Sequence, residues 1–343
     1  MKRGLLSIVV FATLLSGCVV LFTPKYSERG FKMNTDLWEQ HYVGRYLCKL
    51  PMGSKTTLSA SYGLGGVRST EIEYIEGIKK EDLPSIVMAR IAVLRKQRNI
   101  KTGDSMFLGK IEFLNNGVGI VQWSSTTSDA RKILECYFVA KGGQEYVFKF
   151  VHRMLWDEQP DFDASFCRLV GENLYSREPS EAPVGKGFVV DHGFLAVEGH
   201  TFLNDHTCIE KSQLDFSLPD FPAIGFELVV YNFAGEPRNL LDQVDPDYVL
   251  MNYSDKKVIR RGKHNAGDIP GQEICISGER DGATSFECQW GSSGKSNDLA
   301  NQKLILEVQV RTHEKEGGYP TQEELLRLWD AIIETIRLRR DAA

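Results

Sequence analysis

The sequence predicts an α+β fold of two tandem domains, each an antiparallel sheet with packed helices. Three observations carry this prediction. Short apolar runs with turn signals between them indicate antiparallel strands. An amphipathic helix closes each half of the chain. The length of 343 residues suits two domains of average size. Both halves run from an early strand pair through later strands to a terminal helix, so we interpret the chain as a diverged duplication.

The first half, residues 35–178, is expected to form a strand meander with two helices. Apolar residues at helical spacing predict a helix over 81–98, with Pro84 in its first turn and basic residues near its end. A second helix is expected over about 161–175, where it closes this half. Asparagine and glycine turn signals separate the later strands. The strands are expected at 43–51, 58–62, 107–114, 119–123, 133–139 and 146–151.

The second half, residues 179–343, follows the proline-rich segment 177–183, which is typical of a linker. Its last element is expected to be a helix over 321–338, in which Thr321 is the N-cap and Glu324 completes a capping box. The strands are expected at 186–190, 194–198, 214–216, 226–233, 274–276, 285–290 and 303–310.

Residues 1–18 have the layout of a bacterial secretory signal that ends in a lipidated cysteine. A basic start and an apolar run precede Leu15-Ser16-Gly17-Cys18, which fits the consensus at which lipoproteins are cleaved and acylated. The small residues let the backbone fit into the signal peptidase, and the Cys18 thiol is the group that is acylated. We therefore expect a periplasmic protein that is held on the membrane through Cys18. Val19, in place of Asp, favours the outer membrane.

An uncleaved membrane anchor is the alternative for this segment. Apolar character continues to Phe22, and the whole stretch approaches the roughly 20 residues that span a bilayer. In both cases the body lies in the periplasm, after a flexible tether over residues 19–34. Met33 follows the signal, so translation that starts there would produce a minor leaderless form in the cytoplasm.

Six cysteines remain when Cys18 is set aside, and in an oxidising compartment they form up to three disulfides. Spacing alone does not choose among the 15 connectivities that six cysteines allow. We favour Cys275 with Cys288, because each lies in a strand-like run and the segment between them suits a hairpin turn. The alternative is unpaired buried thiols. The candidates are Cys48, Cys136, Cys167, Cys208, Cys275 and Cys288.

The motifs for catalysis and metal binding are incomplete, so we predict no catalytic residue, no cofactor and no metal site. Segment 291–296 lacks the first glycine of a phosphate-binding loop and is expected to be a polar loop. His192, His200, His206 and Cys208 cluster in the sequence but match no zinc spacing. The G-x-S-x-G elbow of common lipases is absent from the sequence. A net charge of -5 gives no reason to expect nucleic acid as a partner.

The aromatic segment 216–222, with Phe226, has two interpretations. It is either an exposed binding patch or a proline-bounded loop that fills the core, and we favour the core. The acidic residues Glu71, Glu73 and Glu76 are expected on a solvated face.

Four segments carry a resemblance to a known family. They are 43–47 with Pro51, the aromatic stretch 216–228, Cys275-Ile276-Ser277-Gly278, and 328–339 in the closing helix. The sequence resembles the two-domain immunity lipoproteins that are paired with lipase effectors of type VI secretion systems. The resemblance covers both halves and is stronger in the second.

This resemblance implies a lipid-anchored periplasmic protein that binds a cognate phospholipase or lipase effector and blocks it without catalysis. It also implies that the two lobes grip the enzyme between them, although it assigns no contact residue. Two other classes compete with this interpretation. One is a non-catalytic structural or assembly lipoprotein of the envelope, and the other is a hydrolase without a recognisable motif.

Overall fold

The computed structural model describes residues 34–64, 68–153, 160–197, 208–233, 235–244, 254–280, 283–312 and 321–342. The predicted signal, Cys18, Met33 and most of the predicted tether lie outside these residues. In the part of the chain that is described, no helix is long and apolar enough to cross a membrane.

The first half contains nine strands, two α-helices and two short 3-10 helices among its described residues. In chain order they are η1 (Thr35–Leu37), β1 (Glu39–Val43), β2 (Tyr46–Leu50), β3 (Lys55–Leu64), β4 (Arg68–Tyr74), η2 (Lys80–Asp82), α1 (Leu83–Lys96), β5 (Phe107–Leu114), β6 (Gly117–Ser125), β7 (Ser128–Val139), β8 (Val147–Arg153), α2 (Pro160–Asn173) and β9 (Leu174–Ser176). Both helices lie where their apolar spacing predicts them.

The second half has a similar series of elements. They are β10 (Gly187–Val190), β11 (Gly193–Ala196), β12 (Cys208–Leu218), β13 (Phe221–Tyr231), α3 (Leu240–Gln243), β14 (Ser254–Lys263), β15 (Gln272–Arg280), β16 (Ala283–Ser292), β17 (Lys303–Thr312), α5 (Gln322–Thr335) and β18 (Arg337–Leu338). Helix α5 begins with the predicted capping box: the Thr321 side chain accepts from the Glu324 N–H, and the Glu324 carboxylate accepts from the Thr321 N–H. The predicted α+β fold class is confirmed.

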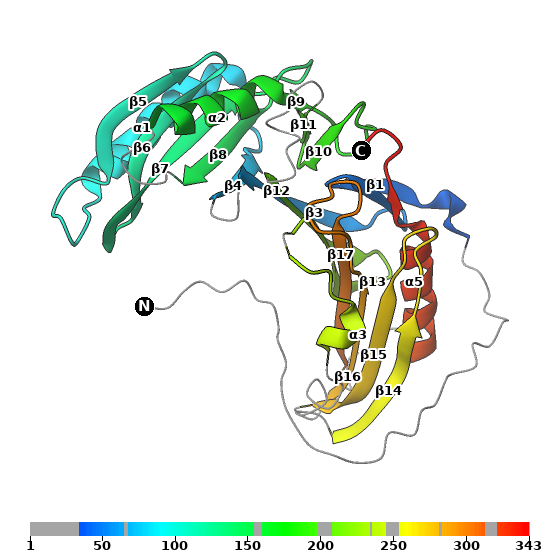
Figure 1. The fold of residues 1–343 in the computed structure, drawn as a ribbon. Helices are drawn as coiled ribbons and strands as arrows, with labels where there is room; N and C mark the ends of the chain where they lie inside the picture. Colours follow the sequence, from blue (N-terminus) through cyan, green and yellow to red (C-terminus); the bar gives the residue numbers. More distant parts are fainter. Residues whose placement is uncertain are drawn as a thin grey trace.

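A single antiparallel sheet of twelve strands runs through both halves, in the order β14-β15-β16-β17-β13-β12-β3-β4-β8-β7-β6-β5. The two halves of this order have the same plan. In the first half, hairpin β3–β4 is followed by α1 and by the meander β5–β8, and β8 pairs with β4. In the second half, hairpin β12–β13 is followed by α3 and by the meander β14–β17, and β17 pairs with β13. The halves join edge to edge where β3 pairs with β12. This internal symmetry is what a duplication predicts, and it gives the ribbon two bodies that meet at an angle (Figure 1).

The two small hairpins are exchanged between the bodies. Hairpin β1–β2 comes from the first half, but it pairs with β18 and its apolar residues join the core beneath α5. Hairpin β10–β11 comes from the second half, but it pairs with β9 and joins the core beneath α2. Each hydrophobic core is therefore built from both halves, whereas the domain boundary at residues 178 and 179 stays a prediction.

The strands that carry many charges are not predicted from the sequence. Strand β14 is the outer edge of the sheet, where charged side chains are common, and its exposed lysines and Arg261 replace the apolar alternation that would predict a strand. Strand β4 alternates exposed Glu71 and Glu73 with Ile72, which is buried. The acidic residues are therefore on a solvated face, as expected, but that face belongs to a strand.

The aromatic segment 216–222 contributes to the core. Phe216 in β12 and Phe226 in β13 face each other in the register, and their rings stack with centroids 5.0 Å apart. Both are nearly fully buried in the core beneath α5. The binding-patch interpretation is wrong for these two rings, because alternation along both strands turns them to the covered face.

A buried ion pair joins the exchanged hairpin to the centre of the sheet. Arg45, between β1 and β2, donates from Nε to Glu210 Oε2 at 2.8 Å and from Nη2 to Oε1 at 2.7 Å. The exposed fractions of the two side chains are 1% and 0%. The Gln302 side chain also donates to Glu210, and Arg45 donates to the Ala342 carbonyl. The pair thus ties the first hairpin, β12 and the last residues of the chain together.

We expect Glu210→Gln to reduce the free energy of unfolding by about 3–5 kcal/mol, since it leaves the Arg45 charge buried without its partner. Urea denaturation measures this loss. The control is Glu73→Gln, which breaks the exposed Lys149–Glu73 ion pair and is expected to cost less than about 1 kcal/mol. The double variant Arg45→Met/Glu210→Leu should recover much of the loss. Equal effects of Glu210→Gln and Glu73→Gln would contradict the role assigned to the buried pair.

Candidate binding surface

The two faces of the large sheet are covered differently. Directly opposed residues on neighbouring strands point to the same face of the sheet, so the strand register shows which residues share a face. One face carries α2 and the exchanged hairpin over the first body, and α5 over the second. The other face carries α1 over the first body. Over the second body, only the four-residue helix α3 covers this second face in the part of the chain that is described.

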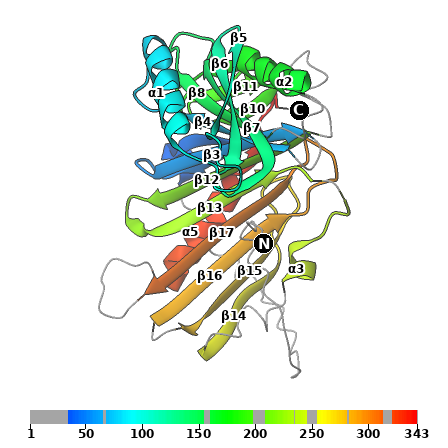
Figure 2. The same cartoon turned by 90° about the vertical axis from the view of Figure 1, so that its left-hand side faces the viewer.

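This open face forms a groove with a volume of about 1020 Å³. Its floor consists of strands β12, β13, β17, β16 and β15, with α3 on one side and Lys55 and Thr57 of β3 at the other. In Figure 2 these strands face the viewer, and α5 lies behind them. The sheet face is therefore accessible as a broad, hollowed surface.

Three carboxylates form a row across the floor of the groove. Asp215 on β12 is opposite Glu227 on β13, and Glu227 is opposite Glu307 on β17. Cβ atoms of directly opposed residues in such a sheet lie about 5 Å apart. Gln289 continues the row on β16 and donates to Glu307. Like charges placed directly opposite each other destabilise a sheet, so this row costs folding free energy.

The central carboxylate, Glu227, has no hydrogen bond or ion pair with the other residues that the structure describes. Burial raises the pKa of Glu227, and the charges of Glu307 and Asp215 raise it further, against a smaller opposing effect of Lys211. Burial also raises the pKa of Glu307, although the hydrogen bond from Gln289 opposes this shift. Both side chains are half-buried, so their charges are only partly screened by water.

The other end of the groove is basic. Lys303 lies over the Tyr231 ring, with Nζ 5.8 Å from the ring centroid, and these two residues are opposite each other in the register. Burial lowers the pKa of Lys303, and the nearby charge of Arg238 lowers it further. Lys303 is thus two register rows from the carboxylate row in one direction, and Lys55 of β3 is one row beyond it in the other.

The structure describes the side chains of five of the six disulfide candidates. Cys275 on β15 and Cys288 on β16 are opposite each other and form a disulfide, the pair that the hairpin spacing favours. Cys48 and Cys136 are buried and carry free thiols, and burial raises the pKa of Cys48 to about 12. Cys167 is also buried, while the side chain of Cys208 lies outside the described residues, as does Cys18.

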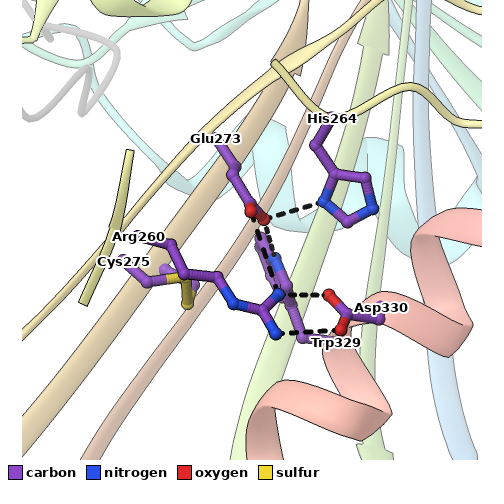
Figure 3. The surroundings of a disulfide bond; sticks show 7 residues. Arg260, His264, Glu273, Cys275, Trp329 and Asp330 are labelled. Carbon is purple, nitrogen blue, oxygen red and sulfur yellow. Dashed lines mark hydrogen bonds and ion pairs between the residues drawn. A yellow bond between two sulfur atoms is a disulfide. The ribbon is translucent and has the colours of Figure 1, made fainter. Parts of the chain in front are cut away.

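A charged cluster lies beside the disulfide, on the α5 side of the sheet (Figure 3). Ligand atoms of His264, Glu273 and Asp330 lie within 4.8 Å of one another. Arg260 donates to Asp330 at 3.0 Å, and its guanidinium is 3.8 Å from Glu273. Trp329 Nε1 also donates to Glu273, at 3.1 Å. Because Arg260 already supplies a cation between the two carboxylates, we interpret the cluster as an anchor for α5.

The electrostatics of this cluster agree with that interpretation. Burial alone would raise the pKa of Glu273, but the hydrogen bond with His264 and the charges of His264 and Arg260 outweigh burial and lower it. The His264 Nδ1 and Glu273 Oε2 atoms are 2.8 Å apart.

The remaining sequence candidates occupy other places. His192 lies in the turn between β10 and β11 and stacks on Tyr74, with ring centroids 4.1 Å apart. His200 and His206 lie outside the described residues. Segment 291–296 is the end of β16 and the polar loop that follows it, as expected.

Sequence reasoning missed the carboxylate row itself. Each acidic residue stands between two buried apolar residues of its strand, which signals a residue on the open face of the sheet. That signal does not reveal that Asp215, Glu227 and Glu307 are neighbours, because the register of three strands decides this.

We expect Glu227→Gln to stabilise the protein by about 0.5 kcal/mol at pH 7, because it removes repulsion between directly opposed carboxylates. A carboxyl group whose pKa is raised by folding binds more protons in the folded state. Its contribution to stability is therefore present at low pH and is lost as the pH rises through the raised pKa. The advantage of Glu227→Gln should thus disappear below about pH 4.5, the ordinary value for Glu. Urea denaturation at several pH values measures this, and an advantage that grows towards low pH would contradict it.

Comparisons with known proteins identify relatives of the chain. The family model described as the Tle cognate immunity protein 4 C-terminal domain matches residues 181–341. No curated protein matches the chain significantly.

Solved structures extend the similarity to both halves. The apo structure of the type VI secretion immunity protein TplEi from Pseudomonas aeruginosa has 28% identity and a TM-score of 0.74, and the match covers 90% of this chain and 99% of that one. A chain in the crystal structure of the Tle4-Tli4 complex has 29% identity and a TM-score of 0.74, with 91% and 100% covered. TplEi complexed with "L" peptide has 27% identity and a TM-score of 0.69, with 89% and 99% covered.

The similarity in sequence and in fold therefore extends over nearly the whole length of these solved chains. Residues 181–341 therefore match a Tle cognate immunity protein 4 C-terminal domain, and over both halves the chain resembles solved immunity proteins of type VI secretion systems.

Proposed function

We propose that this protein is an immunity protein that binds a cognate type VI secreted lipase effector and blocks it. The similarity to a chain of the Tle4-Tli4 complex carries this proposal, because it covers 91% of this chain and all of that one. An inhibitor of this kind protects the producing cell and its siblings from their own effector.

We infer that inhibition is steric. The open groove of the second body offers a concave surface of about 1020 Å³ that can receive side chains of a partner. The exchanged hairpins and the buried Arg45–Glu210 pair hold the two bodies together. A preorganised surface loses little conformational entropy on binding, so more of the contact energy is available for affinity. Occlusion of the lipase active site, or locking of a lid over it, requires no chemistry from the inhibitor.

We propose no catalytic activity for the chain itself. The matching family model is described as an immunity protein, and the catalytic motifs in the sequence are incomplete. The competing interpretation, a structural or assembly lipoprotein, predicts no tight complex with a lipase. A hydrolase predicts turnover of phospholipid by the purified protein.

The purified protein is expected to form a stoichiometric complex with the lipase encoded by the adjacent gene and to abolish its phospholipase activity. Size-exclusion chromatography and a phospholipid hydrolysis assay measure the two effects. A lipase from an unrelated secretion pathway serves as the control and should stay active. If the adjacent lipase remains unbound at micromolar concentrations, the immunity function is wrong for this chain.

We further propose that the protein is anchored in the periplasm, at the outer membrane, by the lipid on Cys18. The lipoprotein consensus before Cys18 supports this location. Anchoring places the inhibitor on the surface where the lipase meets its substrate, which raises its effective concentration there. A minor cytoplasmic form that starts at Met33 would meet the effector before its secretion.

Cys18→Ala is expected to bind the lipase with unchanged affinity but to protect cells poorly, because the anchor is lost and the complex is not. Mass spectrometry should find a lipid on Cys18 of the wild-type protein and none on the variant, and cell fractionation with immunoblotting identifies the membrane and cytoplasmic forms. Met33→Leu should remove a shorter cytoplasmic band and leave the membrane form intact. An unchanged band pattern would dismiss the internal start, and a wild-type protein that carries no lipid on Cys18 would dismiss the lipid anchor.

A further inference from the structure

We propose that Glu227 and Glu307, with Asp215 beside them, form a recognition site for a basic side chain of the effector, most suitably an arginine. This inference rests on the proposed function and adds the chemistry of the contact. It concerns the floor of the groove, where the three carboxylates lie in a row on adjacent strands.

The first body contains an internal precedent for such a contact. Glu135 on β7 lies on the same face of the sheet as the carboxylate row, as the register through β8, β4, β3 and β12 shows. Helix α1 covers that part of the face, and its Arg90 makes a bidentate contact with Glu135 at 2.8 and 2.9 Å. Helix α1, which covers the buried Glu135, therefore also supplies the arginine that binds it.

The second body lacks this arginine. Helix α3 has the sequence Leu240-Leu241-Asp242-Gln243 and carries no cation. Lys303 and Arg238 belong to the other end of the groove, two register rows away from Glu227, which is roughly 13 Å along a strand. Glu227 has no hydrogen bond or ion pair with another described residue. An arginine from a partner would complete in this body the arrangement that Arg90 completes in the first.

The geometry favours a guanidinium over a metal ion. Asp215, Glu227 and Glu307 extend across three strands, about 10 Å in total, so their oxygens do not converge on one small ion. A planar guanidinium has five N–H donors in a fork and can bind two neighbouring carboxylates at once. Ile305, which lies beside Glu307 on the same face of β17, offers an apolar contact for the methylene groups of the same side chain.

The energetics point in the same direction. Opposed carboxylates destabilise the free sheet, and a cation placed between them converts this repulsion into attraction. The gain on binding is therefore larger than for a carboxylate that already has a partner. A row of this kind also selects among partners, because a neutral or acidic side chain would leave it uncompensated.

Glu227→Lys and Glu307→Lys are expected to weaken binding of the purified cognate lipase by roughly 100-fold, and Glu227→Gln by roughly 10-fold. Isothermal titration calorimetry with the full-length proteins measures the dissociation constants. Glu334→Lys makes the same charge change on the exposed side of α5, on the opposite face of the sheet, and is the matched control that should change affinity less than twofold. Higher salt should weaken the wild-type complex more than the Glu227→Gln complex.

The outcomes separate this inference from the proposed function. If the wild-type protein does not bind the lipase, the immunity function fails. If it binds and the folded Glu227→Gln and Glu307→Lys variants keep wild-type affinity, the recognition site is overturned. Should Glu227→Lys fail to fold, Glu227→Gln still decides, because it removes repulsion and is expected to be more stable than wild type. Restoration of binding to Glu227→Lys by one Arg→Glu change in the lipase would identify the partner residue.

Discussion

The buried ion pair between Arg45 and Glu210 fixes the exchanged first hairpin at the junction of the two bodies, where β12 pairs with β3. It places a hairpin from the beginning of the chain against the strand at the centre of the sheet, and it also holds Ala342 near the end. Two charges leave water to form it, which is favourable only when their remaining hydrogen bonds are satisfied. Gln302 donates to the carboxylate, and the Asn232 side chain accepts from the Glu210 N–H. The pair adds to the pairing of β2 with β18 and to the hydrogen bond from the Lys49 N–H to Thr335 Oγ1, which also hold the first hairpin on the core beneath α5.

Around this contact the molecule has an approximate internal symmetry. The Arg339 N–H donates to the Arg45 carbonyl at 3.0 Å, and the Arg177 N–H donates to the His192 carbonyl at 2.9 Å, so each half ends on the hairpin of the other. Arg339 then lies over Phe194, and Arg177 over Tyr42. Burial lowers the pKa of Arg339 to about 10, and the charges of Arg45 and Arg177 contribute. The junction is thus rich in buried arginines, and Glu210 supplies the buried carboxylate among them.

The function that we propose arises from where the two bodies differ. Both present the same strand order, but α1 covers one face of the first body, whereas the equivalent face of the second is a groove. In the first body Arg90 neutralises Glu135, while in the second the carboxylates of Asp215, Glu227 and Glu307 remain together without an arginine. This face of the repeated strand arrangement is therefore covered by a helix in the first body and open in the second.

The sequence by itself determined the local structure. Helical spacing located α1, α2 and α5, the capping box located the start of α5, and strand-like runs around a turn indicated the hairpin that the Cys275–Cys288 disulfide links. These features depend on residues that are close together in the chain, so a local pattern suffices to reveal them. Charged strands such as β14 were missed, because their composition reflects an exposed sheet edge.

Only the tertiary structure decided the exchange of the hairpins, the union of both halves in one sheet, and the carboxylate row. Arg45 and Glu210 are 165 positions apart, and Glu227 and Glu307 meet only because β13 and β17 pair in one register. Alternation along a strand shows which face a residue occupies but not which residue lies beside it. That neighbour is set by long-range packing of apolar residues such as Phe216 and Phe226, and no local pattern contains this information.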